Sequence, residues 1–372
     1  MHITDIPVKS YEKVVHCHDP RNGLQAIISI HNTILGPALG GLRMWPYTTP
    51  RQALLDANRL AKGMTYKSAV ADTGLGGGKA VIIGHAPTDK SERLLRAMGR
   101  FVDTLGGLYI TAEDVGTTVD DMVIVKQETP HVVGLPHGMG GSGNPAPFTA
   151  LGVFFGIMTC VQRALHTDSL KGVRVVVQGC GNVASYLCMH LHEAGAELIV
   201  TDIAPAKAQR LAQQYAARLV APEEIYDVPC EIYAPCALGG TLNDDILPRL
   251  QCQIVAGSTN NQCLTTAHGD ALRQRGIVYA PDFVINAGGL MNVALERTPE
   301  GYSAMHALSK VQTISHTLRA ILDTAACQDI STQRAALLLA KEKLAKGHST
   351  QAREGGKPSS KREKDDSTIS VA

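Results

Sequence analysis

The chain lacks several features that would place it in a nucleic-acid-binding class. Aromatic residues make up only 4% of its 372 residues, so an extended base-stacking surface is not expected. Neither sign of charge dominates, because 35 lysines and arginines stand against 34 acidic residues and leave a formal net charge of +1. Binding to a phosphate backbone usually needs a basic surface, so nucleic acid is excluded as the main partner.

Long apolar runs and paired cysteines are also missing. No segment approaches the roughly 18 consecutive apolar residues of a membrane-spanning helix, and the N-terminus has no apolar targeting core. The nine cysteines include no Cys-x-x-Cys pair, which indicates free thiols in a reducing compartment. A strand through His16, Cys17 and His18 would turn the cysteine away from the two histidines, so no metal site is expected. We therefore expect a cytoplasmic protein with no membrane partner.

The residues that are present favour two α/β domains. A chain of 372 residues exceeds one typical domain. The stretch 139–147 is rich in glycine and proline, which permit sharp turns and stop helices, so it predicts the junction. We expect a substrate-binding and catalytic domain at 1–145 and a cofactor-binding domain with C-terminal helices at 146–345. Charged residues, glycine and serine dominate 346–372, which predicts a disordered tail.

Apolar strand-like runs alternate with amphipathic helices after the junction, which predicts a doubly wound parallel sheet of the Rossmann type. The strands expected there are 173–178, 198–201, 231–233, 253–256 and 277–279, and the helices are 149–165, 182–195 and 204–217. Before the junction, the expected strands are 12–16, 24–31 and 108–111, and the expected helices are 50–64 and one from about 88 to 106.

The first candidate site is a glycine-rich run that ends at Lys79. The run Gly-Leu-Gly-Gly-Gly-Lys occupies 74–79, and Lys67 lies twelve positions before its lysine. Glycines beside a lysine indicate backbone packed close to a bound molecule. Two lysines and the nearby carboxylate of Asp114 have the chemistry to bind an acid and move protons, so this segment predicts a catalytic centre.

A phosphate-binding Walker loop is excluded at this run. Thr73 occupies the position of the first required glycine, and Ala80 follows Lys79 where Ser or Thr is needed. The apolar run 80–83 instead predicts that Lys79 begins a buried strand. Burial and charged neighbours lower the pKa of a lysine in such a place, which suits a general base.

The second candidate site is the run Gly-Cys-Gly-Asn-Val-Ala at 179–184, between an expected strand and an expected helix. In that context the first glycine makes the tight turn, the second admits a pyrophosphate, and the final small residue allows close helix–strand packing. Asp202 ends the next strand, where a carboxylate binds ribose hydroxyls and repels a 2′-phosphate, so NAD is favoured over NADP. The cofactor-binding candidates are Gly179, Cys180, Gly181, Asn182, Val183, Ala184 and Asp202.

With these motifs the chain resembles the bacterial amino-acid dehydrogenases for leucine, valine and phenylalanine, within the glutamate dehydrogenase superfamily. The resemblance covers about 19–315 and includes Leu-Gly-Pro-Ala-Leu-Gly-Gly at 35–41, Met-Thr-Tyr-Lys at 64–67, the lysine run at 74–79, Thr-Ala-Glu-Asp-Val-Gly-Thr-Thr at 111–118, Ser-Gly-Asn-Pro at 142–145, Tyr-Ala-Pro-Cys-Ala-Leu-Gly at 233–239, Asn-Asn-Gln at 260–262 and Ala-Pro-Asp-Phe-Val-Ile-Asn-Ala-Gly-Gly at 280–289.

The resemblance implies a role for each candidate. Lys67 would bind the substrate carboxylate, Lys79 would be the general base, and Asp114 would be its proton-handling partner. Further substrate-binding residues implied by it are Leu39, Gly40, Gly41, Met44, Ala112, Asn261, Leu290 and Val293, and further cofactor-binding residues are Thr149, Ala237 and Asn261. The implied reaction converts an L-amino acid, NAD⁺ and water into a 2-oxo acid, ammonium and NADH. The resemblance also implies a homo-oligomer.

The substrate is inferred from the apolar candidates, which offer no cationic partner for an acidic side chain. They favour leucine and other branched-chain amino acids over glutamate. An enzyme for phenylalanine or another aromatic amino acid is the alternative, and a catalytically silent NAD-binding sensor is the alternative from another class. Leu290 and Met291 stand where the leucine enzymes usually carry Val-Ile, which would trim the pocket. Nothing explains Ser258 and Thr259, which replace the usual alanines.

Overall fold

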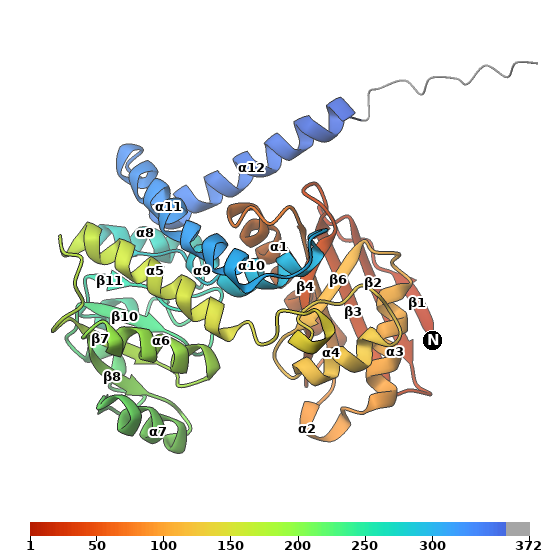
Figure 1. The fold of residues 1–372 in the computed structure, drawn as a ribbon, viewed down its shortest axis with the longest axis horizontal. Coiled ribbons are helices and arrows are strands. Elements are labelled where there is room, and N and C mark those ends of the chain that lie inside the picture. The colour runs from red at the N-terminus through yellow and green to blue at the C-terminus, as the bar shows by residue number, and fades with distance from the viewer. Residues whose placement is uncertain (355–372) are drawn as a thin grey trace, which may run out of the picture.

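The computed structural model describes residues 1–354, with side chains described for residues 1–347. Two α/β units lie side by side and a long C-terminal helix runs across from one to the other (Figure 1). The expected fold class is therefore confirmed. The two sheets fall on either side of residue 145, which we keep as the proposed domain boundary.

The N-terminal sheet has six strands in the order β1-β2-β3-β5-β4-β6. Strand β4 pairs in parallel with both β5 and β6. The other neighbouring pairs, β1 with β2, β2 with β3 and β3 with β5, are antiparallel. The strands are β1 (His2–Asp5), β2 (Lys13–Asp19), β3 (Leu24–Asn32), β4 (Ala38–Trp45), β5 (Gly76–Ile83) and β6 (Tyr109–Glu113), and the helices are α1 (Pro50–Val70), α2 (Ala86–Asp89), α3 (Glu92–Asp103) and α4 (Val119–Lys126).

The two faces of this sheet are packed differently. Helices α3 and α4 cover one face, where they share a large apolar core with alternate residues of β2 to β6. Helix α1 covers the other face, with Ala53 and Ala57 packed against Val81 of β5. Because successive strand residues point to opposite faces, the residues of β4 and β5 that face α1 are the ones able to contribute to a site between the two units.

Helix α1 is longer than its sequence pattern predicts. It begins at Pro50, where the hydroxyl of Thr49 accepts a hydrogen bond from the Gln52 amide, and it continues to Val70 instead of ending at 64. Its last turns bury polar side chains that are hydrogen-bonded, such as Ser68, which donates to the Gly76 carbonyl at 3.1 Å. Polar residues that have hydrogen-bond partners are stable on a buried helix face. The spacing of apolar residues alone therefore predicted an end of α1 that was too early.

The second sheet is entirely parallel, in the order β12-β11-β10-β7-β8-β9. Its strands are β7 (Arg174–Gln178), β8 (Glu197–Thr201), β9 (Arg218–Leu219), β10 (Ile232–Pro235), β11 (Ile254–Val255) and β12 (Val278–Tyr279). The helices that alternate with them are α5 (Ala146–Ala164), α6 (Asn182–Glu193), α7 (Pro205–Tyr215) and α8 (Thr266–Gln274). Every strand and helix expected after the junction is present, and among the elements of this sheet the two-residue edge strand β9 and helix α8 were not anticipated.

Four helices follow the second sheet: α9 (Asp282–Ile285), α10 (Gly288–Ala294), α11 (Ala304–Cys327) and α12 (Thr332–Glu354). Helix α12 crosses over to the N-terminal unit and packs on α1 (Figure 1). Just after the end of α1, the Asp72 carboxylate contacts the Lys343 ammonium of α12 at 2.5 Å. The helix runs past the expected start of the tail at residue 346, and 355–372 lie outside the described residues. In residues 1–354 no helix is long and apolar enough to cross a membrane.

Candidate active site

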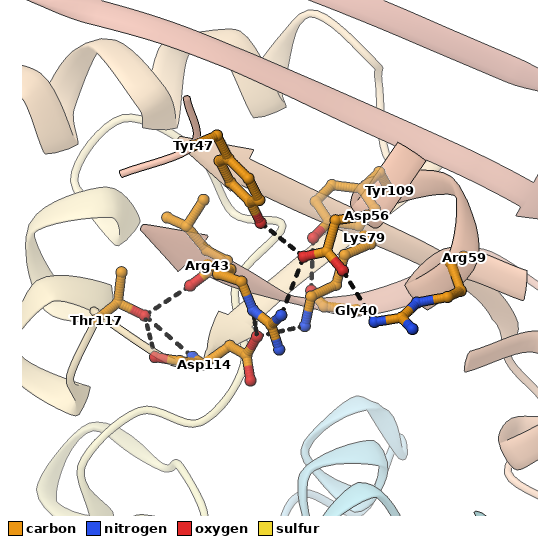
Figure 2. A network of polar contacts seen from close by, with 10 residues as sticks. Gly40, Arg43, Tyr47, Asp56, Arg59, Lys79, Tyr109, Asp114 and Thr117 are labelled. Carbon is orange, nitrogen blue, oxygen red and sulfur yellow. Dashed lines mark hydrogen bonds and ion pairs between the residues drawn. The ribbon is translucent and has the colours of Figure 1, made fainter. Parts of the chain in front are cut away.

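The two residues expected to carry the chemistry lie together on the N-terminal sheet, one in the middle of a strand and the other just after one. Lys79 lies on β5, Asp114 directly follows β6, and the Lys79 Nζ atom is 2.5 Å from Asp114 Oδ2 (Figure 2). The Lys79 side chain is buried, with 6% of its surface exposed, whereas Asp114 is 22% exposed. The carboxylate is therefore the more accessible end of this ion pair.

Arg43 is a member of this cluster that the sequence interpretation missed. Its Nε donates to the same Asp114 oxygen at 3.1 Å, and its NH1 group donates to Asp56 Oδ2 at 3.0 Å (Figure 2). Tyr47 donates to that Asp56 oxygen at 2.7 Å. Two cations and two carboxylates therefore alternate from Lys79 outward, which fixes the position of Asp114 without leaving a charge unpaired.

The turn after β6 is held by a hydroxyl that was also not anticipated. Thr117 donates to the Leu42 carbonyl at 2.8 Å and accepts from the Asp114 amide at 3.0 Å (Figure 2). Thr117 caps no helix, so its hydrogen bonds serve the turn alone. It ties the end of β6 to β4 and thereby orients the Asp114 carboxylate toward Lys79.

The charges of Lys79 and Asp114 are strongly perturbed. Burial lowers the pKa of Lys79, and Asp114 opposes that shift by stabilising the ammonium. Burial alone would raise the pKa of Asp114, but Lys79 and Arg43 overcome it and hold that pKa at about 2. Asp114 is therefore an anion at neutral pH, and Lys79 loses its proton more easily than an exposed lysine.

The glycines of β4 make room for this pair. A Cβ atom on Gly41 would lie 2.7 Å from the Asp114 Cβ and 3.3 Å from the Lys79 Nζ. A Cβ on Gly40 would collide with the Gly78 carbonyl, and the Gly40 carbonyl accepts a hydrogen bond from Tyr109 at 2.5 Å. The expectation that main chain approaches closely here thus has a steric basis at both positions.

Lys67 lies on the last turn of α1, at a cavity of about 240 Å³ between the two units. Burial lowers its pKa to about 8, and the cation of Lys79 adds to that shift while Asp282 and Asp114 oppose it. Among residues 1–347, whose side chains are described, the Lys67 ammonium makes no hydrogen bond or ion pair. It is therefore available to a carboxylate that enters the cavity.

The other end of this cavity is apolar. Leu39, Ala112, Leu290 and Val293 belong to one buried cluster and all line it, together with Gly40 and Gly41. Asn261 lines the neighbouring cavity, which shares Lys67 and Asn260 with this one. The structure thus gathers most of the expected substrate residues around one space.

Met44 is the exception, and its assignment to the cavity is wrong. Its side chain is 1% exposed and packs in the core between the sheet and α3, on the face of β4 away from the cavity. Leu39 and Gly41 lie on the face of β4 that is turned toward the cavity. Because successive residues of a strand point to opposite faces, Arg43 lies on that same face and Met44 on the opposite one. The same alternation would have identified Arg43 from the sequence.

The expected dinucleotide loop has the shape its motif predicts. Gly179 has a φ of +99°, and a Cβ there would lie 2.9 Å from the Ala237 Cβ, so only glycine fits comfortably. A Cβ on Gly181 would meet nothing within 4 Å, which leaves open space before the first turn of α6. Ala184 is buried where α6 packs on the sheet.

Asp202 follows β8 and is fixed by main chain. Its Oδ2 accepts from the Cys180 amide at 2.7 Å, and its Oδ1 accepts from the Ala204 amide at 2.8 Å. The carboxylate is thereby held beside the glycine loop with lone pairs left for ribose hydroxyls. Thr149 and Val183 line the substrate cavity, which places the start of α5 and α6 next to the reacting end. These residues fit a nicotinamide dinucleotide.

A buried lysine–carboxylate pair in one unit and a dinucleotide-type glycine loop in the Rossmann sheet of the other indicate a nicotinamide-dependent oxidoreductase, and the comparisons with known proteins specify the family. The description "Glu/Leu/Phe/Val dehydrogenase, dimerisation domain" matches residues 11–131, and "Glutamate/Leucine/Phenylalanine/Valine dehydrogenase" matches residues 140–206 and 201–352. The chain belongs to the Glu/Leu/Phe/Val dehydrogenase family, as the sequence motifs predicted. It is an amino-acid dehydrogenase.

Several relatives are similar over nearly the whole chain. Leucine dehydrogenase from Bacillus cereus is 52% identical over 335 residues, which cover 90% of this chain and 91% of the relative. The crystal structure of L-tryptophan dehydrogenase from Nostoc punctiforme has a TM-score of 0.77 at 45% identity and covers 91% of this chain and 97% of that one. A hetero-hexameric glutamate dehydrogenase from Thermus thermophilus, in a Leu-bound form, has a TM-score of 0.76 at 25% identity and covers 95% and 89%.

Proposed function

We propose that the protein catalyses the reversible, NAD-dependent oxidative deamination of L-leucine and other branched-chain L-amino acids to 2-oxo acids and ammonium. The observation that carries this proposal is a single cavity with an unpaired lysine at one end and an apolar cluster at the other. The Lys79–Asp114 pair lies on the same sheet face. The similarity to curated leucine dehydrogenases supports the same choice of substrate.

Each end of the substrate has a partner in this arrangement. The Lys67 ammonium binds the α-carboxylate, and the apolar cluster takes the aliphatic side chain. Lys79 accepts a proton from the substrate ammonium and releases it to solvent, and it then accepts a proton from the water that attacks the imine and returns it to the departing nitrogen. Asp114 stabilises the protonated form of Lys79. The bound dinucleotide supplies the oxidant that accepts a hydride from Cα. Holding the reactants between two domains excludes bulk water and fixes their orientation.

We expect NAD⁺ to be strongly preferred over NADP⁺. The Asp202 carboxylate is held beside the glycine loop by two amides, so it cannot easily turn away from a 2′-phosphate. The measurement is kcat/KM for each cofactor with leucine at saturation. Equal or better use of NADP⁺ would show that Asp202 does not select the cofactor.

The side-chain cluster sets the ranking of amino acids. We expect leucine, valine and isoleucine to be oxidised well, phenylalanine poorly and glutamate hardly at all, because a second carboxylate would lose its hydration without a cationic partner. Replacing Leu290, which is 7% exposed in this cluster, by alanine should raise relative activity toward larger side chains. A difference of one methylene is worth roughly 1–3 kcal/mol, so a change in relative activity of about tenfold or more is expected.

Initial rates of NAD⁺ reduction with a panel of amino acids test this ranking. The variant Leu55→Ala is a matched control, because Leu55 is 59% exposed on the outer side of α1. If the unmodified enzyme prefers phenylalanine, the aromatic alternative holds instead. If Leu290→Ala leaves the ranking unchanged, the assignment of this side chain to the pocket is wrong.

The assembly and the location are also proposals. The N-terminal match is described as a dimerisation domain, and the structural relative from Thermus thermophilus is a hexamer. These support a homo-oligomer without fixing the number of subunits. The cytoplasmic location expected from the unpatterned cysteines stays a prediction.

A further inference from the structure

Glu296 joins two segments that are far from it in the sequence. It lies in the short helical turn η4 (Leu295–Arg297) that continues α10. Its Oε1 atom accepts hydrogen bonds from the Gly134 amide at 2.9 Å and from the Ser142 amide at 2.7 Å. Gly134 and Ser142 are both buried, so these two amides depend on Glu296 for their acceptor.

The segments that Glu296 joins form two walls of the substrate cavity. Gly134 itself lines the cavity, and the preceding residue Val133 packs in its apolar cluster. On the other side, Leu290 and Val293 of α10 line the same cavity. Leu290, Val293 and Glu296 follow at intervals of three, so they lie along one side of the helix and its continuation. A single carboxylate therefore fixes the spacing between the Gly134 wall and the α10 wall.

A second set of contacts holds the same junction. The buried Asn292 side chain donates to the Ser142 carbonyl at 3.5 Å and accepts from the Tyr302 hydroxyl at 2.8 Å. Ser142 is thus bound through its amide to Glu296 and through its carbonyl to α10. The end of the interdomain segment has little freedom to move away from α10 while Glu296 keeps both bonds.

We propose that Glu296 is a positioning residue for substrate specificity, which sets the size of the side-chain end of the cavity by clamping the Gly134 segment to α10. This inference rests on the proposed function, because it assigns the selection among amino acids to that cavity. Glu296 does not line the cavity and touches no substrate. It acts through Gly134, Leu290 and Val293.

Glu296 acts here as a hydrogen-bond acceptor, and this role does not require its negative charge. Both amides use the same carboxylate oxygen, and no Lys, Arg or His among the described residues forms an ion pair with Glu296. A glutamine has an oxygen at the same position that accepts both bonds. An alanine leaves both buried amides without an acceptor, which lets the Gly134 wall move away from α10.

The test compares Glu296→Ala, Glu296→Gln and Glu296→Asp with the control Arg297→Ala, an exposed neighbour on the same turn. The readout is the ratio of kcat/KM for leucine to kcat/KM for phenylalanine, with KM and kcat determined separately. We expect Glu296→Ala to lower this ratio by about tenfold, the lower end of what a methylene-sized change in a pocket is worth, mainly through a higher KM for leucine. The Gln variant and the control should stay within about twofold of the unmodified enzyme.

Glu296→Asp keeps the carboxylate on a shorter side chain, so it should also lower the leucine-to-phenylalanine ratio. This variant replaces Glu296→Ala in the test if the Ala variant does not fold. An unchanged ratio in the Ala and Asp variants would overturn the inference, as would a Gln variant that behaves like Ala. A general loss of stability would lower kcat for both substrates without changing their ratio. A preference of the unmodified enzyme for phenylalanine would count against the proposed function alone, because the inference is judged on the change in the ratio.

Discussion

Lys79→Met is expected to lower kcat for leucine oxidation by roughly 10²- to 10⁴-fold, the usual contribution of a general acid–base group. Methionine keeps most of the side-chain volume next to Asp114 but has no proton to exchange. Asp114 retains Arg43 as a partner at 3.1 Å, so the site should keep its shape. The dissociation constant for NAD should change little, because the glycine loop at 179–184 belongs to the other sheet. The measurement is steady-state kcat together with NAD binding by fluorescence titration.

The control for this experiment is Lys171→Met, at an exposed lysine on the far side of the cofactor domain. It should have the rate of the unmodified enzyme. A rate close to that of the unmodified enzyme in Lys79→Met would rule out Lys79 as the base. Loss of NAD binding together with activity would instead indicate that the substitution disturbs the fold.

The second large effect concerns the pH dependence of carboxylate binding at Lys67. Its pKa is lowered to about 8, so the ammonium that binds a carboxylate is present below pH 8 and is lost above it. Inhibition by 4-methylpentanoate, which has the carbon skeleton of leucine but no amine, isolates this contact. Its inhibition constant should be flat below pH 8 and rise about tenfold per pH unit above it, toward roughly 100-fold at pH 10.

Lys67→Arg tests that assignment. A guanidinium keeps its proton throughout this range, so the inhibition constant should depend little on pH even where its absolute value is higher. The same rise in both enzymes would show that another group, such as Lys79, carries the pH dependence. Lys62→Arg is the matched control, because Lys62 also lies on α1 but does not line the substrate cavity. It should keep the pH profile of the unmodified enzyme.

The fold and the two glycine-rich motifs could be predicted from the sequence because the patterns that identify them are local. The run that ends at Lys79 has no Walker pattern and leads into apolar residues. Lys79 lies in the buried strand β5, which begins at Gly76, three residues before the expected start. The glycine motif at 179–184 also lies between β7 and α6 as predicted. Strand period, helix period and turn residues need only neighbours in the chain to be recognised.

The parts that were missed depend on contacts between distant segments. Arg43 is 71 positions from Asp114, and no local pattern joins them, although the alternation in β4 would have separated Arg43 from Met44. Glu296 is 162 positions from Gly134. A carboxylate after a short helix looks like an ordinary surface residue until the fold brings the interdomain segment against it. The packing of α12 on α1 likewise joins segments that are far apart in the sequence.

The most direct test of the central claim is to mix the enzyme with L-leucine and NAD⁺ and to measure NADH by absorbance and ammonium by a coupled assay. The account predicts that both appear in equal amounts and that 2-oxo-4-methylpentanoate forms with them. It also predicts that adding ammonium and this 2-oxo acid to NADH reverses the reaction. If NAD⁺ binds but no amino acid in the panel yields NADH, the protein is an NAD-binding sensor and the proposed function is wrong.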